Sequence, residues 1–346
     1  MTVLRATLSV LCIGVIVYGI LDVLTNVENN KCYMTYMFQM PEYIRVPLGK
    51  KISKEFPRYG LYLYGEGQYA DQIKNFKLSG IPVLFIPGNA GSYKQVRSLG
   101  SVALRKSEDE RKPFHFNYFS VDLNEGGMIA RALFTLPDFD QQLVNTIITQ
   151  ATPHQGPVIA LDRHMSQFYD NVNGYWRKHS NTALKHVTVI STGGGYRDKL
   201  VRHAFTSLKG IVDPELSVST STMSVPNAWV STDHLCAVWC KQMVMTTKRA
   251  MFDIIDPNTH QVIEDTGYRM AVFRHHFLSH SGPKQYDNSW TEEIVLDPKV
   301  EWSVKEEKLW EFARSKVIHL KLQEIKDMTH IVLIVPKTDL KIYMKE

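Results

Sequence analysis

The chain has 346 residues, of which 44% are hydrophobic, so it can bury one large core and part of a second. Its 40 basic and 35 acidic residues give a formal charge of +5 and form no long basic run. This composition indicates a globular protein and argues against a nucleic-acid partner.

Residues 1–24 contain one apolar run, which follows Arg5, comprises about 16 uncharged residues and ends at Asp22. The run is a little shorter than the ~20 residues that cross a bilayer, but longer than the ~7 to 15 of a cleaved signal peptide. We interpret it as an uncleaved signal-anchor transmembrane helix, with a cleaved signal peptide as the alternative. Arg5 would stay cytoplasmic, which places the bulk of the chain on the lumenal side of the secretory pathway.

Three cysteines, Cys32, Cys236 and Cys240, lie beyond the apolar run. A lumenal compartment permits disulfides, but three cysteines leave one unpaired. The i, i+4 spacing of Cys236 and Cys240 fits either a disulfide between them or two thiols packed on one helix face. The sequence leaves both alternatives open.

From residue 81 onward, short apolar runs alternate with glycine-rich turns and helical patterns. We expect strands at 81–86, 116–121, 146–149, 187–191 and 228–232, and helices at 93–106, 127–136 and 235–253. Continuous apolar strands that alternate with helices are typical of a mostly parallel sheet covered on both faces. The sequence therefore predicts the α/β class for a domain over residues 25–284.

After about residue 285 the pattern changes to strands without long helices, at 317–322 and 331–335. Three tryptophans between 290 and 310 add bulky side chains that are typical of strands. We expect a small, partial β domain over residues 285–346.

An acid and a histidine follow two successive predicted strands. Asp198 comes after 187–191 through a glycine-rich turn, and His234 comes after 228–232. The carboxyl ends of parallel strands meet at one edge of a sheet, where chemistry collects. In α/β-hydrolases an acid orients a histidine, which takes the proton of a serine. Singly, each residue is an ordinary loop or helix-start residue, but together they predict a catalytic acid and base.

Two further clusters are less specific. The turn Pro87–Ser92 follows the first core strand and is suited to an oxyanion, to a phosphate or to a plain structural turn. His275, His276 and His280 have no acids at metal-binding spacing nearby, so we expect surface histidines and no metal site.

The nucleophile is missing. No G-x-S-x-G occurs in the chain, although the strained strand-to-helix turn of a hydrolase needs small residues on each side of its serine. The strand at 116–121 instead runs through Glu125 into Gly126-Gly127 and a helix, which is the back half of such a turn. Ser120 lies inside that strand, so we do not expect it to substitute.

Several stretches of the chain are specific enough to compare with known families, namely residues 62–67, 86–98, 148–154, 194–198 and 229–235. Together they resemble the GPI inositol-deacylase family, the membrane-anchored serine esterases of the endoplasmic reticulum, over residues 30 to about 270. The nucleophile turn of the family resembles GHSMGG followed by ARAL, and only residues 126–133 match it here. A segment of roughly fifty residues, with a strand, a helix and the serine, has no counterpart between Glu125 and Gly126. The C-terminal membrane region of the family has none either.

This resemblance implies an α/β-hydrolase-like sheet that lacks one βα segment. It implies hydrolysis of the acyl ester on the inositol of GPI-anchored proteins, which promotes their export from the endoplasmic reticulum. Asp198 and His234 would be acid and base, and Asn89 with Ala90 would form the oxyanion hole. No metal or organic cofactor is implied. The partners would be GPI-anchored proteins or GPI lipid and membrane lipid, at the endoplasmic reticulum membrane with the bulk of the chain lumenal.

Three hypotheses follow. The first is a family chain that is inactive because alternative splicing or an imperfect gene model removed the serine. The second is a non-catalytic, membrane-anchored binder of GPI-anchored proteins or lipid. The third is another lumenal lipase with a relocated serine near His234.

Overall fold

The computed structural model describes residues 11–21, 31–36, 38–88, 91–122, 128–159 and 162–278, and the backbone of two strands near the C-terminus. The chain divides into two compact units, Met1–Trp290 and Thr291–Glu346. In the second unit, β8 (Ile318–Lys321) pairs in parallel with β9 (Ile342–Lys345). The expected strand at 331–335 lies outside the described residues, and the proposed domain boundaries remain predictions.

Near the N-terminus, residues 11–21 form a helix. Among the described residues, no helix is both long and apolar enough to span a membrane. The expected signal anchor over 1–24 extends beyond the described residues at both ends.

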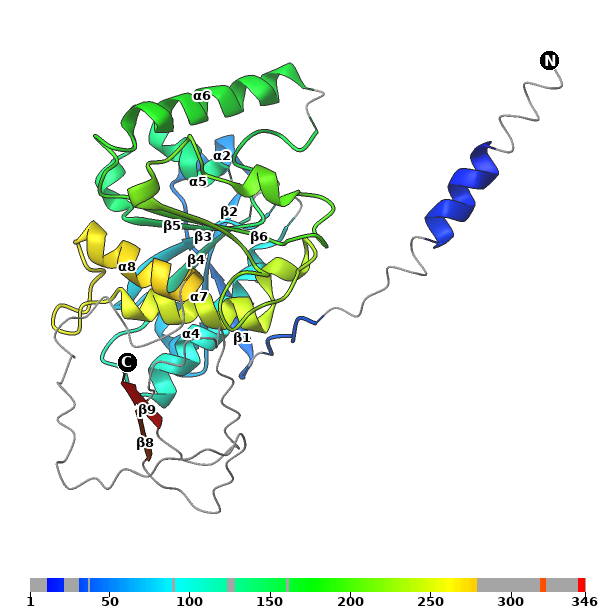
Figure 1. Cartoon of the computed structure of the whole chain (residues 1–346). Helices are drawn as coiled ribbons and strands as arrows, with labels where there is room; N and C mark the ends of the chain where they lie inside the picture. The colour runs from blue at the N-terminus through cyan, green and yellow to red at the C-terminus, as the bar shows by residue number, and fades with distance from the viewer. Residues whose placement is uncertain are drawn as a thin grey trace. The chain divides into compact units, whose positions relative to one another are not determined.

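The strands of the first unit form two sheets (Figure 1). The first has the order β1-β2-β4-β3, with β1 (Pro41–Arg45), β2 (Gly60–Glu66), β3 (Ile81–Phe85) and β4 (Phe116–Asp122). β2 is antiparallel to both β1 and β4, and β3 is parallel to β4. The second sheet consists of the parallel strands β5 (Thr146–Gln150), β6 (Thr188–Gly193) and β7 (Ser217–Ser221). The predicted α/β class with a mostly parallel sheet is confirmed from β3 onward.

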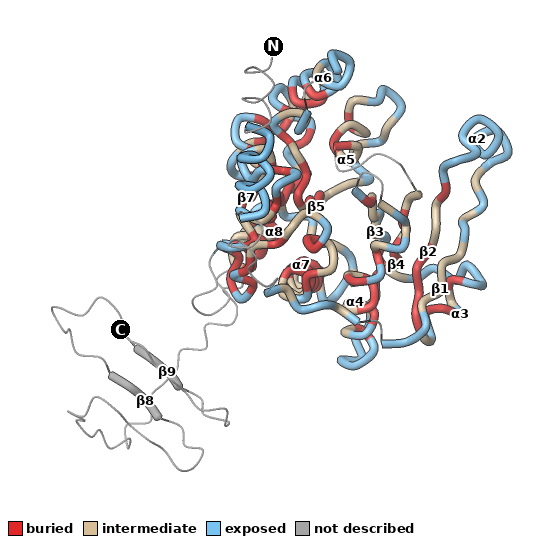
Figure 2. The backbone as a smooth tube through the Cα atoms, turned by 90° about the vertical axis from the view of Figure 1, so that its right-hand side faces the viewer, coloured by how far each residue is buried: buried red, intermediate tan, exposed pale blue. Residues whose placement is uncertain are grey.

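Helices lie on both sides of these strands (Figures 1 and 2). The described helices after residue 40 are α2 (Lys50–Glu55), α3 (Gln68–Lys74), α4 (Arg97–Asp109), α5 (Ile129–Ala132), α6 (Arg163–His179), α7 (Lys241–Asp253) and α8 (Thr266–Phe277). Because side chains alternate along a strand, β6 buries Ile190 in the core formed with α4, α7 and α8, and Val189 in the core formed with α6.

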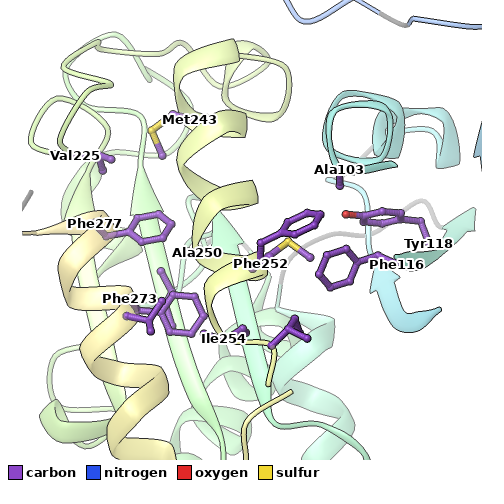
Figure 3. Packing of buried hydrophobic residues seen from close by; sticks show 14 of the residues in the cluster. Ala103, Phe116, Tyr118, Val225, Met243, Ala250, Phe252, Ile254, Phe273 and Phe277 are labelled. Atoms are coloured by element: carbon purple, nitrogen blue, oxygen red, sulfur yellow. The ribbon is translucent and has the colours of Figure 1, made fainter. Parts of the chain in front are cut away.

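The larger core connects the two sheets. Phe252 of α7 packs against Phe116 of β4, with ring centroids 5.1 Å apart, while α8 contributes Phe273 and Phe277 on the other side of α7 (Figure 3). Each of these rings is buried, and burying such a side chain contributes about 1.5–3 kcal/mol. Helix packing therefore holds together two sheets that share no strand ladder among the described residues.

The expected strand at 228–232 is wrong. Asn227 and Trp229 have φ angles of 62° and 45°, in the left-handed region, so the segment follows an irregular path. Its buried side chains, Ala228, Val230 and Thr232, alternate as in a strand although they pack a loop. The third parallel strand is β7, whose sequence SVSTS is too polar to be recognised as one.

Two expected helices are shorter than their patterns. The helix at 127–136 is reduced to α5 and a 3-10 turn at Leu133–Thr135, and Leu136 is exposed. The helix at 235–253 starts as a 3-10 turn at Cys236–Val238, and α7 begins at Lys241.

A disulfide joins Cys32 to Cys240, across 208 positions of sequence, so a Cys236–Cys240 bridge is not the pairing observed. Residues four apart on a helical turn have Cβ atoms about 5–6 Å apart, beyond the ~3.5–4.5 Å that a disulfide requires. The backbone N–H of Lys241 also donates to the carbonyl of Tyr33 at 2.7 Å. These contacts fix the N-terminal segment to the start of α7.

The apolar sequence of β3 predicts a strand that is buried on both faces, but the structure exposes one of them. Pro82 and Leu84 are exposed, and Leu84 has 53% of its surface accessible. Within the described part of the chain, β3 is an edge strand of the first sheet and β5 an edge strand of the second. Each therefore has one side without a ladder partner.

Unpaired edges should be visible in hydrogen exchange. We expect amides of β3 and β5 to exchange faster than those of β4 and β6, because a strand paired on one side opens at lower free energy. Peptide-resolved deuterium exchange measures this, with β4 and β6 as internal controls. Equal protection of all four strands would show that a further segment covers the edges.

Candidate active site

The end of β6 lies against the loop that carries His234. The carbonyl of Gly194 accepts hydrogen bonds from the backbone N–H of Thr232 at 2.8 Å and the hydroxyl of Ser231 at 3.0 Å. A Cβ on Gly194 would lie 2.6 Å from the carbonyl oxygen of Thr232 and 2.8 Å from the Cβ of Asp198. Gly195 has a φ of +85°, which glycine adopts without strain. The glycine-rich turn is therefore what allows the two segments to approach.

This approach brings Asp198 and His234 together. The Oδ2 atom of Asp198 lies 3.1 Å from Nδ1 of His234. Its Oδ1 accepts backbone N–H groups from Leu200 at 3.1 Å and Val201 at 2.8 Å. The carboxyl group is fully buried, whereas 30% of the His234 side chain is exposed. Asp198 is thus fixed in place, and the imidazole reaches the surface.

The pair has a defined proton arrangement. Because the carboxylate accepts from Nδ1–H, Nε2 is the nitrogen available to take a proton from a hydroxyl. The hydrogen bond to Asp198 raises the pKa of His234, although partial burial acts in the opposite direction. A histidine held in this way can act as a general base.

The structure does not place the other expected site residues next to Asp198 and His234. Asn89, Ala90 and the junction of Glu125 with Gly126 lie outside the described residues. Ser120 is fully buried in β4 and donates its hydroxyl to the carbonyl of Tyr93 at 2.8 Å, so it does not substitute for the nucleophile. Among the described residues, no serine hydroxyl hydrogen bonds to His234.

The expectation of surface histidines is wrong for His276. It is buried on α8, and its Nε2 lies 2.8 Å from Oδ2 of Asp253 at the end of α7. His275 is half-buried, and His280 lies outside the described residues. The packing of α8 against α7, which brings His276 to Asp253, decides this burial, and a contact between two helices cannot be read from local spacing.

Sequence reasoning missed the surroundings of the pair. A pocket of about 380 Å³ lies beside Asp198, and it is lined by Gly195, Tyr196, Asp198, Arg202, His203, Ser221 and Met223. Exposed apolar side chains also lie on the two segments that carry the pair: Tyr196, Leu200, Met223, Trp229 and Leu235, the apolar rim. No local pattern in the sequence indicated the left-handed conformation of Trp229.

Comparison with known families identifies the domain in which Asp198 and His234 lie. The model of the PGAP1-like alpha/beta domain matches residues 77–125 and 126–254, in two blocks that meet at the junction of Glu125 and Gly126. The matched region includes β3 to β7, Asp198 and His234.

Curated relatives share the same region. The chain is 43% identical to the GPI inositol-deacylase of Rattus norvegicus over 319 residues, 78% of this chain and 34% of the rat protein. It is 39% identical to that of Xenopus laevis over 361 residues, 89% of this chain and 39% of the frog protein, and 32% identical to that of Drosophila melanogaster over 314 residues. The chain spans about a third of the length of these relatives.

The alignment with the rat protein has more positions than the number of residues of this chain that it covers. Since 78% of 346 residues is about 270, roughly 50 of the 319 aligned positions have no residue here. The same arithmetic for the frog protein, 89% of 346 against 361, gives a similar surplus. On the strength of the family match, this chain belongs to the family of proteins with a PGAP1-like alpha/beta domain, which includes the GPI inositol-deacylases.

Proposed function

We propose that this chain carries the acid and base of a serine esterase that removes the acyl group from the inositol of GPI-anchored proteins in the endoplasmic reticulum. The observation that carries the proposal is the 3.1 Å contact between buried Asp198 and partly exposed His234, in a domain of this family. Asp198 orients the imidazole and stabilises its protonated form. His234 Nε2 removes the proton of a serine that attacks the ester carbonyl. The backbone N–H groups of Asn89 and Ala90 would receive the developing oxyanion.

The chain contains no G-x-S-x-G turn and so lacks the nucleophilic serine of such an esterase. β3 is an edge strand of the first sheet, and β5 is an edge strand of the second. The family match breaks between residues 125 and 126, after β4 and before β5. A strand placed between β3 and β5 would pair both free edges and join the sheets. The aligned surplus in the relatives is long enough for that strand, the nucleophile turn and a helix. We infer that the chain without this segment does not hydrolyse the ester.

The apolar rim supports a lipid partner. Trp229 and Leu235, which precede and follow His234 in the sequence, have 67% and 70% of their surface exposed. The cationic residues Arg197, Lys199 and Arg202 lie on the same segment as Asp198. Exposed aromatic and aliphatic side chains beside basic ones are typical of surfaces that rest at a membrane interface. A non-catalytic lipid or GPI-protein binder is therefore the second candidate function.

The acid–base pair predicts a pH-dependent stability. A pKa of His234 raised above its unfolded value contributes stability that is fully present below about pH 6.5 and is lost as pH rises through the folded value. We expect the difference in free energy of unfolding between wild type and Asp198→Asn to be larger at pH 6 than at pH 9, measured by urea titration. Imidazole NMR should show the pKa of His234 falling in this variant.

Gly194→Ala should lower the same pKa, because its Cβ cannot fit against Thr232. Gly174→Ala is the matched control, since Gly174 is exposed on α6 with no atom within 4 Å of the added Cβ. That control should raise stability by about 0.5–1 kcal/mol. An unchanged His234 pKa in Asp198→Asn would contradict the pairing.

A chimera tests the missing segment. The roughly 50 residues of the rat protein that have no counterpart here are inserted between Glu125 and Gly126. Cells lacking the deacylase are then assayed for free inositol hydroxyls on surface GPI-anchored proteins. We expect activity from the chimera and none from the original chain. Asp198→Asn in the chimera should reduce turnover by about 10⁴-fold, because the imidazole loses its orienting acceptor. Deacylation by the original chain would overturn the inferred inactivity.

The membrane contact predicts quenching of one tryptophan. With the full chain in vesicles that contain brominated acyl chains, part of the tryptophan fluorescence should be quenched, and Trp229→Phe should remove the quenched part. Trp176→Phe is the control, because Trp176 is fully buried and should leave the quenched part intact. Identical quenching of both variants would count against the apolar rim as a lipid contact.

A further inference from the structure

Three cysteine sulfurs lie together beside the loop that carries His234. The Sγ atoms of Cys32, Cys236 and Cys240 are all within 4.8 Å of one another. Cys32 and Cys240 form the disulfide, and Cys236 lies outside it. Cys236 is fully buried, two residues after His234. A thiol is thus placed against an existing disulfide in a region shielded from solvent.

Contacts other than the disulfide hold the N-terminal segment in this position. The carbonyl of Lys31 accepts from the side-chain amide of Gln242 at 2.9 Å, and the carbonyl of Tyr33 accepts from the N–H of Lys241 at 2.7 Å. The hydroxyl of Thr35 donates to the carbonyl of Trp239 at 3.2 Å. The segment therefore remains against the start of α7 when the bond from Cys32 to Cys240 breaks.

We propose that these three residues form an internal thiol–disulfide exchange site, in which Cys32 changes its partner from Cys240 to Cys236. The Cys236 thiol loses its proton, and the thiolate attacks Sγ of Cys32. The bond between Cys32 and Cys236 forms as the bond between Cys32 and Cys240 breaks. Cys240 leaves as a thiolate and takes up one proton. The number of disulfides is unchanged, so the step consumes no oxidant and no reductant.

Attack occurs at Cys32 for a geometric reason. Cys236 and Cys240 lie on one helical turn, in which the N–H of Cys240 donates to the carbonyl of Cys236 at 2.9 Å. A disulfide between them would have to span this turn. Positions four apart on such a turn keep their Cβ atoms beyond disulfide distance. Cys32 comes from a separate segment, and its sulfur is already near both partners.

The exchange would move the disulfide that attaches the N-terminal segment closer to Asp198 and His234. In the observed state, Cys32 is bound at the residue preceding α7. After exchange it is bound within the 3-10 turn that begins at Cys236, whose N–H donates to the carboxylate of Asp233 at 2.7 Å. The N-terminal segment would then be linked two residues from His234. This inference does not depend on the identity of the nucleophile or on ester hydrolysis.

Peptide mapping of the full chain tests the exchange. The purified protein is incubated in a glutathione redox buffer, quenched with acid, alkylated and digested with chymotrypsin. This protease cleaves after Trp239, so Cys236 and Cys240 fall in separate peptides. We expect the Cys32–Cys240 peptide at first and a Cys32–Cys236 peptide that grows with time. Its absence throughout, while Cys32–Cys240 persists, would overturn the proposal.

Single variants sharpen the result. Cys240→Ser should form Cys32–Cys236, whereas Cys32→Ser should leave Cys236 and Cys240 as thiols. Cys236→Ser should keep Cys32–Cys240 and abolish the time-dependent product, and Cys12→Ser, outside the cluster, should behave as wild type. A Cys236–Cys240 disulfide in Cys32→Ser would show that the helical turn does not exclude that pairing and would contradict the assigned route. Because the wild-type map decides the main question, misfolding of a variant does not affect it.

Discussion

The carbonyl of Gly194 is the contact on which the candidate site depends. It accepts from the N–H of Thr232, the hydroxyl of Ser231 and the hydroxyl of Thr222, at 2.8, 3.0 and 3.1 Å. These bonds fasten the loop after β7 to the end of β6. Any side chain at residue 194 would separate them, because a Cβ there meets both Thr232 and Asp198. The acid–base geometry is therefore a result of backbone packing around one glycine.

The division of the sheet affects the two parts of the proposed machinery differently. Asp198 and His234 both belong to the second sheet and its loops, which keep their ladder and their helices. The first sheet contributes β3 and the turn that follows it. Between them the core is continuous through α7, where Phe252 contacts Phe116. Helix packing can therefore keep the acid and base in place although no strand among the described residues connects the sheets.

The helix that follows the break shows poorly satisfied polar groups. Arg131 is fully buried in α5, and one guanidinium nitrogen donates to Oδ1 of Asn173 at 2.5 Å. Its Nε and Nη1 have no hydrogen-bond partner, and no carboxylate pairs with it in the described part of the chain. Burial lowers the pKa of Arg131 to about 9. Such a cation costs several kcal/mol in effective desolvation, so the fold is locally inconsistent at this helix.

Local signals in the sequence determined the strands β3 to β6, the order of acid and histidine, and the absence of a nucleophile turn, because apolar runs and glycine-rich turns act over a few residues. Tertiary structure alone decided three other features. Asn227 and Trp229 take left-handed conformations, so an apolar run became a loop. Cys32 pairs with Cys240 across 208 residues, because spatial proximity and not spacing selects a disulfide. β3 became an edge strand, since the pairing of an edge depends on which segments are present to cover it.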